Sequence, residues 1–420
     1  PSSIFYLNSL FYLPIVKFFM FQMGAFLIFL YSNIILISKL IHDKIKKKYN
    51  FLTFYYLLSF IFINIFFYRL AEHGTDRSAQ ILIFLFFIYI LSLRGSYQNF
   101  DNILPKLIVL LSIIISLKAF YVLYFIFIIP FIYYIVKDNK FYLIYKIFKS
   151  PIFYFSVLMG ICVILVYFFN TGCLLYPVQQ TCISGIEWGI PKSEVSALNT
   201  HYQWWSKAGG GPGYSHELEK SLYIQNFNWV SHWIEKYFLG KFLEQLGLLL
   251  AVFLIIFLLF KNFKLKNELL ILNKKTLCFY LIILSIFFIW FTKHPSLRYG
   301  GYSIVFLTLS IPMAIMFQCV KNRNNFRDKF KYFVIFIIIV FNLKNITRID
   351  NEFKRTDLYK FDNFPFFAIP EKKFIFEKFP SGLIIYRTSG HCWNTPTPCI
   401  GNLSGKINVK NNNGYYFIYR

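Results

Sequence analysis

Long, nearly uninterrupted runs of hydrophobic positions dominate this chain, in place of the short alternating patterns of a soluble core. A helix needs about twenty apolar residues to cross a lipid bilayer, and most of these runs have that length. We therefore predict an all-α polytopic membrane protein with about ten transmembrane helices. The predicted spans are 17–41, 51–69, 79–93, 104–136, 152–170, 241–260, 276–292, 302–320 and 332–347.

A single charge, Lys118, interrupts the run over 104–136. We interpret this run as two short spans that meet at Lys118 on the outer face. Residues 1–16 predict an outer loop or a helix that lies in the membrane interface. The remaining spans each come from one run.

Lysine and arginine crowd every second hydrophilic loop and are scarce in the loops between them. Loops rich in these residues stay in the cytoplasm, so this alternation orients the chain. It places both ends of the chain and a long loop over 171–240 on the outer side. We predict a multi-pass protein of a bacterial inner (cytoplasmic) membrane, with the long loop and the C-terminus in the periplasm. The predicted cytoplasmic loops carry Lys44, Lys46, Lys47, Lys48, Lys137, Lys140, Lys146, Lys149, Lys261, Lys264, Lys266, Lys274, Lys275, Lys321, Arg323, Arg327, Lys329 and Lys331.

The hydrophobic pattern changes near residue 347 and divides the chain into two predicted domains. Residues 1–347 form the transmembrane helical domain. Residues 348–420 carry short apolar alternations among Pro, Gly and Asn, which predict a small outer domain with β-strands.

Charged residues make up only 15% of the chain, against about 25% in soluble domains, so lipid is the expected solvent. The formal net charge of +25 would suit a nucleic-acid partner. Basic loops beside anionic headgroups explain this charge without such a partner. We predict membrane lipid as a partner and no nucleic acid.

The predicted topology sorts the seven cysteines. Cys173 and Cys182 share the long loop, and Cys392 and Cys399 share the tail, so both pairs face an oxidising compartment. A local disulfide is predicted for each pair, with free thiols as the alternative. Neither pair has the spacing of a zinc site, and no metal site is predicted. Small apolar roles inside spans are predicted for Cys162, Cys278 and Cys319.

Ionisable residues at the outer ends of spans are the candidate chemistry, because charge near hydrocarbon is costly. The first group is the turn Glu72-His73-Gly74-Thr75-Asp76-Arg77. A carboxylate here could accept a proton from a hydroxyl nucleophile or bind a divalent cation through oxygen. The alternative is a solvated turn in which Glu72 or Asp76 pairs with Arg77.

Positive charge comes from Lys118 and from a second outer turn, Lys293-His294-Pro295-Ser296-Leu297-Arg298-Tyr299-Gly300-Gly301-Tyr302. Lys118 either extends to the interface or holds a lipid phosphate as a point charge. Arg298 is suited to bidentate binding of phosphate oxygens, with Lys293 and His294 beside it. The alternative for this turn is interfacial anchoring by its Arg and Tyr side chains.

The long loop is rich in tryptophan. Trp229, Trp233 and Tyr237 recur at helical spacing, and the favoured interpretation of the two Trp is an interfacial aromatic belt. Trp204 and Trp205 precede Lys207 and a glycine run over 209–213, and their rings could pack on a sugar or cover a lipid headgroup. That run lacks the Lys-Ser/Thr of a P-loop, so nucleotide binding is not supported. Further aromatic and acidic residues of this loop are Trp188, Glu187 and Glu194.

Several short motifs occur in order along nearly the whole chain: PSSIFYLNSL near the start, EHGTD, SLKAFY around Lys118, GCLLYP at 172–177, HPSLRYGGY at 294–302 and HCWNTPTPC at 391–399. Together they resemble the GT-C class of integral-membrane glycosyltransferases, and more narrowly a bacterial family of large membrane proteins of unassigned substrate.

The resemblance implies transfer of a sugar from a polyprenyl-phosphate carrier to a glycan or lipid acceptor on the outer side of the membrane. In that class a catalytic acidic residue lies in the first outer loop, so we expect the principal base upstream of Pro1. A second acidic position matches Asp76, with Glu72 as the backup. Lys118 and Arg298 match positions that contact the carrier phosphate. A structural role is implied for Cys392, Trp393, Pro398 and Cys399.

Other interpretations remain open at this point. A lipid-linked polysaccharide polymerase or ligase would also use a long outer loop with cations. A transporter or flippase predicts ionisable residues in mid-membrane, whereas most charges here lie at span ends. A purely structural membrane protein is the last alternative. The sugar, the acceptor and any need for a divalent cation stay unassigned.

Overall fold

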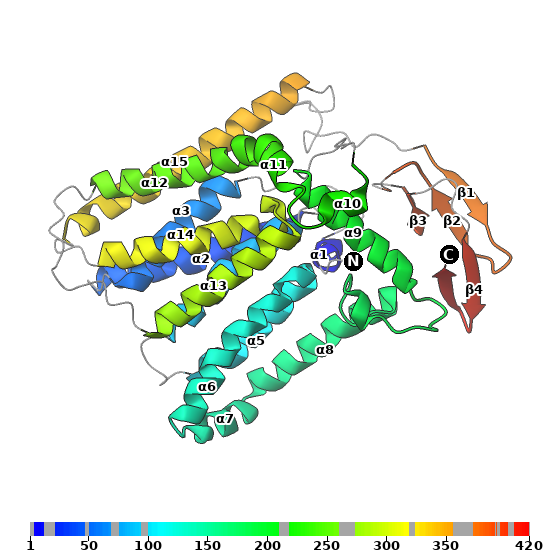
Figure 1. Ribbon diagram of the computed structural model, residues 1–420, viewed down its shortest axis with the longest axis horizontal. Helices are drawn as coiled ribbons and strands as arrows, with labels where there is room; N and C mark the ends of the chain where they lie inside the picture. Colours follow the sequence, from blue (N-terminus) through cyan, green and yellow to red (C-terminus); the bar gives the residue numbers. More distant parts are fainter. Residues whose placement is uncertain are drawn as a thin grey trace.

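The computed structural model describes residues 4–11, 22–46, 50–68, 75–93, 100–209, 218–259, 274–318, 324–355, 373–390, 392, 395–401 and 407–419. Helices make up most of them (Figure 1). The first half contains α1 (Ile4–Ser9), α2 (Met23–Ile45), α3 (Phe51–Phe66), α4 (Thr75–Ser92), α5 (Phe100–Leu117), η2 (Ala119–Ile128), α6 (Ile129–Lys137), α7 (Phe141–Phe148) and α8 (Pro151–Thr171). The second half contains η3 (Gln179–Thr181), α9 (Lys192–Lys207), α10 (Lys220–Ile224), α11 (Val230–Trp233), η4 (Ile234–Phe242), α12 (Leu243–Leu259), α13 (Lys274–Lys293), η5 (Leu297–Tyr299), α14 (Gly301–Gln318) and α15 (Asn324–Arg355).

Each predicted span coincides with a helix over its described part, which confirms a mainly helical membrane protein. Six of these helical segments are long and apolar enough to cross a bilayer. They are Met23–Ile45, Ala119–Lys137, Pro151–Thr171, Val230–Phe257, Thr276–Lys293 and Tyr332–Lys354. Shorter apolar helices cover Phe51–Phe66, Asn102–Leu117 and Gly301–Phe317. The count of about ten spans and their sidedness stay predictions.

The core of the bundle surrounds α3, which is buried along nearly its whole length and packs against α2, α4, α14 and α15. A capping box starts α3: the Asn50 side chain accepts from the Thr53 backbone N–H at 3.1 Å. The Thr53 hydroxyl also donates to Asp43 at 2.5 Å, which ties α3 to the preceding helix. These polar contacts fix the turn that brings α2 and α3 together.

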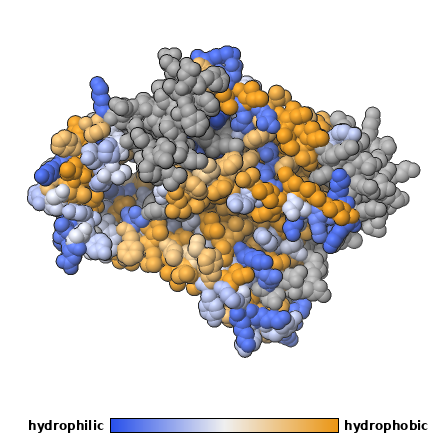
Figure 2. Space-filling view, turned by 180° about the vertical axis from the view of Figure 1, so that it is seen from behind, coloured by the Kyte–Doolittle hydropathy of each residue, from blue (hydrophilic) through white to orange (hydrophobic). Residues whose placement is uncertain are grey.

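At the edge of the bundle, α8 packs mainly against α5. Ser156 donates to the carbonyl of Pro105 at 2.9 Å, and Tyr167 donates to the carbonyl of Ile115 at 3.1 Å. The other faces of α8 expose large apolar side chains such as Phe155 and Leu158. Figure 2 shows a broad area of hydrophobic surface with hydrophilic side chains at its margins. An apolar surface of this kind is what lipid contact requires.

Two differences from the predicted elements concern helix length. The last span, predicted to end at 347, belongs to α15, which runs on to Arg355, so the predicted domain boundary falls inside a helix. The span predicted at 241–260 is continuous with α11 and η4, and its apolar segment begins at Val230. In both cases the helix continues through the polar residues at which the sequence predicts the end or the start of a span.

The predicted C-terminal strands are confirmed. Strand β1 (Ile375–Lys378) pairs antiparallel with β2 (Ile384–Arg387), which pairs in parallel with β3 (Cys399–Ile400). Strands β4 (Asn408–Asn412) and β5 (Tyr415–Tyr419) form a separate hairpin. Lys410 of that hairpin pairs with Glu187 of the long loop at 3.1 Å. The strands therefore lie beside the long loop, at the end of the bundle opposite α7 (Figure 1).

Candidate functional site

Asp76 is the centre of an ion cluster at the start of α4, before the apolar segment that begins at Ala79. The residue is buried, and two cations bind its two carboxylate oxygens. Arg298 Nε donates to Oδ2 at 2.5 Å, and Lys118 Nζ donates to Oδ1. Lys118 lies between α5 and η2, and Arg298 lies in η5. The fold therefore joins three predicted site residues that are far apart in the sequence.

Gln80 fixes the backbone of the turn that carries Arg298. It lies one helical turn after Asp76 on α4 and is fully buried. Its side-chain amide donates to the carbonyl of Leu297 at 3.3 Å and accepts from the backbone N–H of Ser303 at 2.9 Å. One face of α4 thus holds both the guanidinium and the backbone of the turn. Sequence analysis missed Gln80 because a neutral amide inside an apolar run gives no charge signal.

Aromatic side chains of α11 and η4 hold the same turn from the other side. Trp233 Nε1 donates to the carbonyl of Pro295 at 2.8 Å, and the Tyr237 hydroxyl accepts from the Leu297 backbone N–H at 2.8 Å. Trp229, Trp233 and Tyr237 are all buried. The predicted aromatic belt is therefore wrong for these residues, because their rings pack on protein.

Two glycines let the turn come close to its neighbours. Gly300 has φ +92, and a Cβ there would lie 3.2 Å from a ring carbon of Phe120. A Cβ on Gly301 would lie 2.5 Å from the indole of Trp290. Trp290 Nε1 also donates to the carbonyl of Ser296 at 3.1 Å. The Gly300-Gly301 pair is thus needed for the path of this turn.

The ion cluster forms part of the lining of a cavity of about 770 Å³. A volume of this size is typical of small-molecule sites. Its lining comes from Asp76, Leu117, Lys118, Ala119, Phe120, Val122, Leu123, Tyr167, Tyr176, Pro177, Val178, Gln180, Asn199, His201, Tyr202, Gln203, Trp205, Ile289, Lys293, His294, Arg298 and Tyr299. Five of the predicted phosphate and catalytic residues, and Trp205 of the predicted sugar-packing pair, are among them.

Aromatic rings cover the cations of the cluster. Lys118 Nζ lies 4.1 Å from the centre of the Tyr299 ring, and the guanidinium carbon of Arg298 lies 5.9 Å from a Trp205 ring. Trp205 and Tyr299 meet edge to face with their centroids 5.6 Å apart. Cation–π contacts of this kind hold a cation in place without neutralising its charge.

One face of α9 forms a second wall of the cavity. Asn199, Tyr202 and Gln203 line it, at the spacing that places side chains on one face of a helix. One turn further on, Ser206 Oγ lies 3.5 Å from His294 Nδ1. This polar stripe was present in the sequence as an i, i+3, i+4, i+7 pattern and could have been found there.

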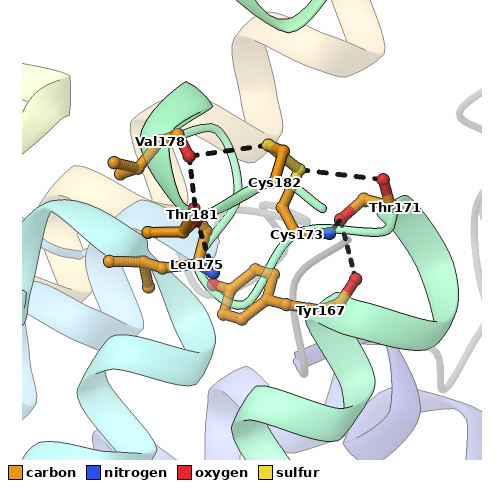
Figure 3. Close-up of a disulfide and its surroundings, with 7 residues drawn as sticks. All are labelled: Tyr167, Thr171, Cys173, Leu175, Val178, Thr181 and Cys182. Carbon is orange, nitrogen blue, oxygen red and sulfur yellow. Dashed lines mark hydrogen bonds between the residues drawn. A yellow bond between two sulfur atoms is a disulfide. The ribbon is translucent and has the colours of Figure 1, made fainter. Parts of the chain in front are cut away.

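Further lining residues come from the loop between Cys173 and Cys182, which Figure 3 shows. The structure brings these two cysteines to disulfide distance, as predicted, and Cys392 and Cys399 likewise. Inside the first loop, the Thr181 hydroxyl donates to the carbonyls of Leu175 at 3.0 Å and Val178 at 2.8 Å. The cavity is lined by four residues of this loop, namely Tyr176, Pro177, Val178 and Gln180.

Burial and the two cations act in opposite directions on Asp76. Burial alone raises its pKa, but Lys118 and Arg298 outweigh burial, so the pKa of the carboxyl lies below its ordinary value. Burial lowers the pKa of Lys118, and Asp76 opposes that change. Asp76 is therefore ionised at pH 7, and its charge favours the protonated form of Lys118.

His294 is surrounded by positive charge. Burial, followed by Lys118, Lys207 and Lys293, lowers its pKa to about 4, so its imidazole is neutral at pH 7. Burial and Lys293 lower the pKa of Lys207 to about 8. Lys207 does not line the cavity, because its ammonium donates to the carbonyl of Ile224 at 2.8 Å.

The remaining predicted site residues lie elsewhere. Trp204 is not among the described lining residues, and Lys220 Nζ lies 4.9 Å from its ring, so sugar packing by Trp204 stays a prediction. Arg77 lies on α4 but outside the lining. Glu72 and the glycines at 210, 211 and 213 lie outside the described residues. Within the described part of the chain, no cluster of three or more His, Cys, Asp or Glu residues is placed to hold a metal ion.

A family model described as a domain of unknown function, DUF8201, matches residues 1–306. The match includes every residue of the cavity lining and excludes the C-terminal strands. No curated protein and no solved structure matches the chain.

Proposed function

The chain belongs to the DUF8201 family, a domain of unknown function, and we propose that it is a membrane glycosyltransferase. It moves a sugar from a polyprenyl-phosphate carrier to a glycan or lipid acceptor on the outer side of a bacterial inner membrane. The bond between the anomeric carbon and the carrier phosphate breaks, and a bond from that carbon to the acceptor oxygen forms. The carrier phosphate leaves as an anion.

The observation that carries the proposal is the convergence of Asp76, Lys118 and Arg298 on one cavity. A leaving phosphate gains negative charge in the transition state, and cations already held in position stabilise that charge. Arg298 is suited to this role because its side chain is 64% exposed even though Asp76 orients it. Apolar helices border the same cavity, as a lipid-linked substrate requires.

The ion pairs bear on the role of Asp76. A general base works best with a pKa near the operating pH, and the cations lower the pKa of Asp76. We propose that Asp76 positions Lys118 and Arg298 rather than accepting the acceptor's proton. Glu72 lies outside the described residues, and its role as the base stays a prediction.

The transport alternative has less support. The polar pair inside the bundle that links α2 to α3 is Asn64 and Asn33, whose side chains share a hydrogen bond of 2.7 Å. Neither side chain ionises, whereas proton or ion coupling uses ionisable groups in mid-membrane. A polymerase or ligase would use the same cavity and would differ in its product.

The test measures sugar transfer by the protein in liposomes that contain lipid-linked sugar. Arg298→Ala and Lys118→Met should lower transfer by about 10²–10³-fold while membrane insertion stays normal. Lys354→Ala is the matched control, because Lys354 forms an exposed ion pair with Asp350 on α15. Full activity in both cavity variants would contradict the proposal. Transfer of long chains instead of single sugars would favour the polymerase or ligase.

A further inference from the structure

The described residues of the cavity lining include one carboxylate, Asp76, and three side chains of Lys or Arg, namely Lys118, Lys293 and Arg298. We call this set of residues the charged wall. They come from the start of α4, the residue after α5, the end of α13 and η5. Among the described lining residues, α9 and the Cys173–Cys182 loop, which we call the neutral wall, contribute no Asp, Glu, Lys or Arg.

Among the described lining residues, the charged wall has an excess of two positive charges, since it contains one carboxylate and three cations. Lys118 and Arg298 together balance Asp76 and one further negative charge. Lys293 can balance a second negative charge of the ligand. His294 adds no charge at pH 7, because its pKa is about 4. A ligand with two negative charges at one end therefore complements this wall.

The other wall offers neutral hydrogen-bonding groups. The side-chain amides of Gln180, Asn199 and Gln203 line the cavity and form no hydrogen bond within the described part of the chain. An amide both donates and accepts, which suits the hydroxyls of a sugar. A carboxylate is bound more strongly by cations, and this wall supplies no Lys or Arg. The wall therefore favours an uncharged, hydroxyl-rich group.

Apolar residues complete the lining. Phe120, Val122 and Leu123 of η2 face the cavity together with Ile289 of α13. Both segments are candidate membrane spans, and they contact each other. A hydrocarbon chain attached to the charged group can lie along them. The cavity thus has three parts, for lipid, for anionic groups and for a neutral polar group.

We propose that the ligand is a lipid-linked sugar diphosphate whose sugar is uncharged. This inference rests on the proposed glycosyltransferase function and specifies its donor. Both phosphates lie against Lys118, Arg298 and Lys293, and the sugar lies against the amides of Gln180, Asn199 and Gln203.

Three matched probes test the proposal by their affinity for the full protein in lipid nanodiscs, measured by ligand-observed binding. They are farnesyl-diphospho-glucose, farnesyl-phospho-glucose and farnesyl-phospho-glucuronate. The first and the third carry the same net charge, but the third places one charge on the sugar. The first should bind about ten-fold more tightly than either of the others, the effect of one lost charge-assisted contact.

Each outcome separates this inference from the proposed function. Equal affinity for the glucuronate probe would overturn the division of the cavity into a charged and a neutral wall. Equal affinity for the monophosphate probe would overturn the diphosphate, and the glycosyltransferase proposal would stand if that probe also donates its sugar. Failure of all three probes to bind would contradict both.

Two variants test which part of the ligand each wall of the cavity binds. Lys293→Gln should remove the advantage of the diphosphate over the monophosphate probe, and Lys293 is exposed, so the fold tolerates the change. Gln203→Leu should weaken binding of farnesyl-diphospho-glucose and leave binding of farnesyl diphosphate without sugar unchanged. Lys354→Gln is the control. Unchanged discrimination in Lys293→Gln, or equal losses for both probes in Gln203→Leu, would overturn the assignment.

Discussion

The two ends of the helical bundle use basic residues in different ways. At the α7 end, Lys146 and Lys149 lie near the rings of Tyr142 and Tyr145, four residues earlier on the same stretch of chain, at 5.9 and 4.4 Å. Both lysines are exposed, and these two ring contacts are local. At the cavity end, Lys118 reaches Asp76 across 42 residues of sequence, and Arg298 reaches it across 222.

This difference separates anchoring from a built site. An exposed lysine whose ring contact lies on its own stretch of chain keeps conformational freedom, which suits a headgroup surface of variable structure. A cation held by a buried carboxylate from another helix has lost that freedom before the ligand arrives. Such preorganisation is what transition-state stabilisation needs. Both ends of the bundle carry basic residues. They differ in whether the group that contacts each basic side chain comes from the same stretch of chain or from another helix.

The largest expected effect comes from a substitution at the cavity end, where the cations are already held in position. Arg298→Ala removes the exposed guanidinium beside the cavity and should lower sugar transfer by about 10²–10³-fold, as for loss of a donor to a developing anion. Lys146→Ala at the α7 end should leave transfer unchanged. Transfer rates of both variants in liposomes check this contrast. A similar loss in both variants would mean that general surface charge, and not the cluster, sets the rate.

The second effect concerns stability. Asp76→Asn leaves Lys118, whose side chain is only 17% exposed, without its anion. We expect a loss of about 2 kcal/mol in the free energy of unfolding, below the usual cost of breaking a buried pair because Arg298 is exposed. Asp350→Asn breaks an exposed pair and should cost under about 1 kcal/mol. Chemical unfolding in detergent measures both. Equal losses would show that the cluster is no more than a surface ion pair.

The third effect concerns the neutral wall. Replacing Cys173 and Cys182 together by Ser frees the loop that carries Tyr176 and Gln180, and should weaken binding of a lipid-linked sugar by about ten-fold. The same change at Cys392 and Cys399 is the control, because neither residue lines the cavity. Isothermal titration calorimetry compares the affinities of the two double variants for the lipid-linked sugar. An equal effect of both pairs would place the loop's role in stability rather than in binding.

The smallest effect is a pH dependence. The pKa of His294 falls from 6.5 to about 4 on folding, so between these values the unfolded chain binds more protons than the folded one. Stability should therefore decrease as pH falls from 6.5 towards 4, by about 1 kcal/mol for this partly exposed ring. His294→Gln should remove that part of the slope. Unfolding curves at several pH values in that range measure it, and an unchanged slope would contradict the assignment.

Much of the fold was predictable because long apolar runs have few other solutions. The helices, the C-terminal strands and the two cysteine pairs follow from length, alternation and compartment. The charged half of the site was predictable too, since Asp76, Lys118 and Arg298 each stand at the end of an apolar run. Their meeting at one point was not, because it depends on the packing of α4 against α5 and η5.

The neutral half of the site shows where sequence reasoning fails. Gln80 lies inside an apolar run, and nothing in the sequence tells a bridging amide from a tolerated one. Trp229 and Trp233 have the same spacing whether they face lipid or protein, so the belt prediction was wrong. The spacing of Asn199, Tyr202 and Gln203 on α9 is visible in the sequence. The sequence does not show that these residues and the Cys173–Cys182 loop line the same cavity.

The most direct test is a cryo-electron microscopy structure of the full protein with farnesyl-diphospho-glucose bound. Phosphate density within hydrogen-bond distance of Lys118 and Arg298, with the sugar against α9, is the predicted result. Phosphate density among the lysines between α6 and α8, with the cavity empty, would contradict the account.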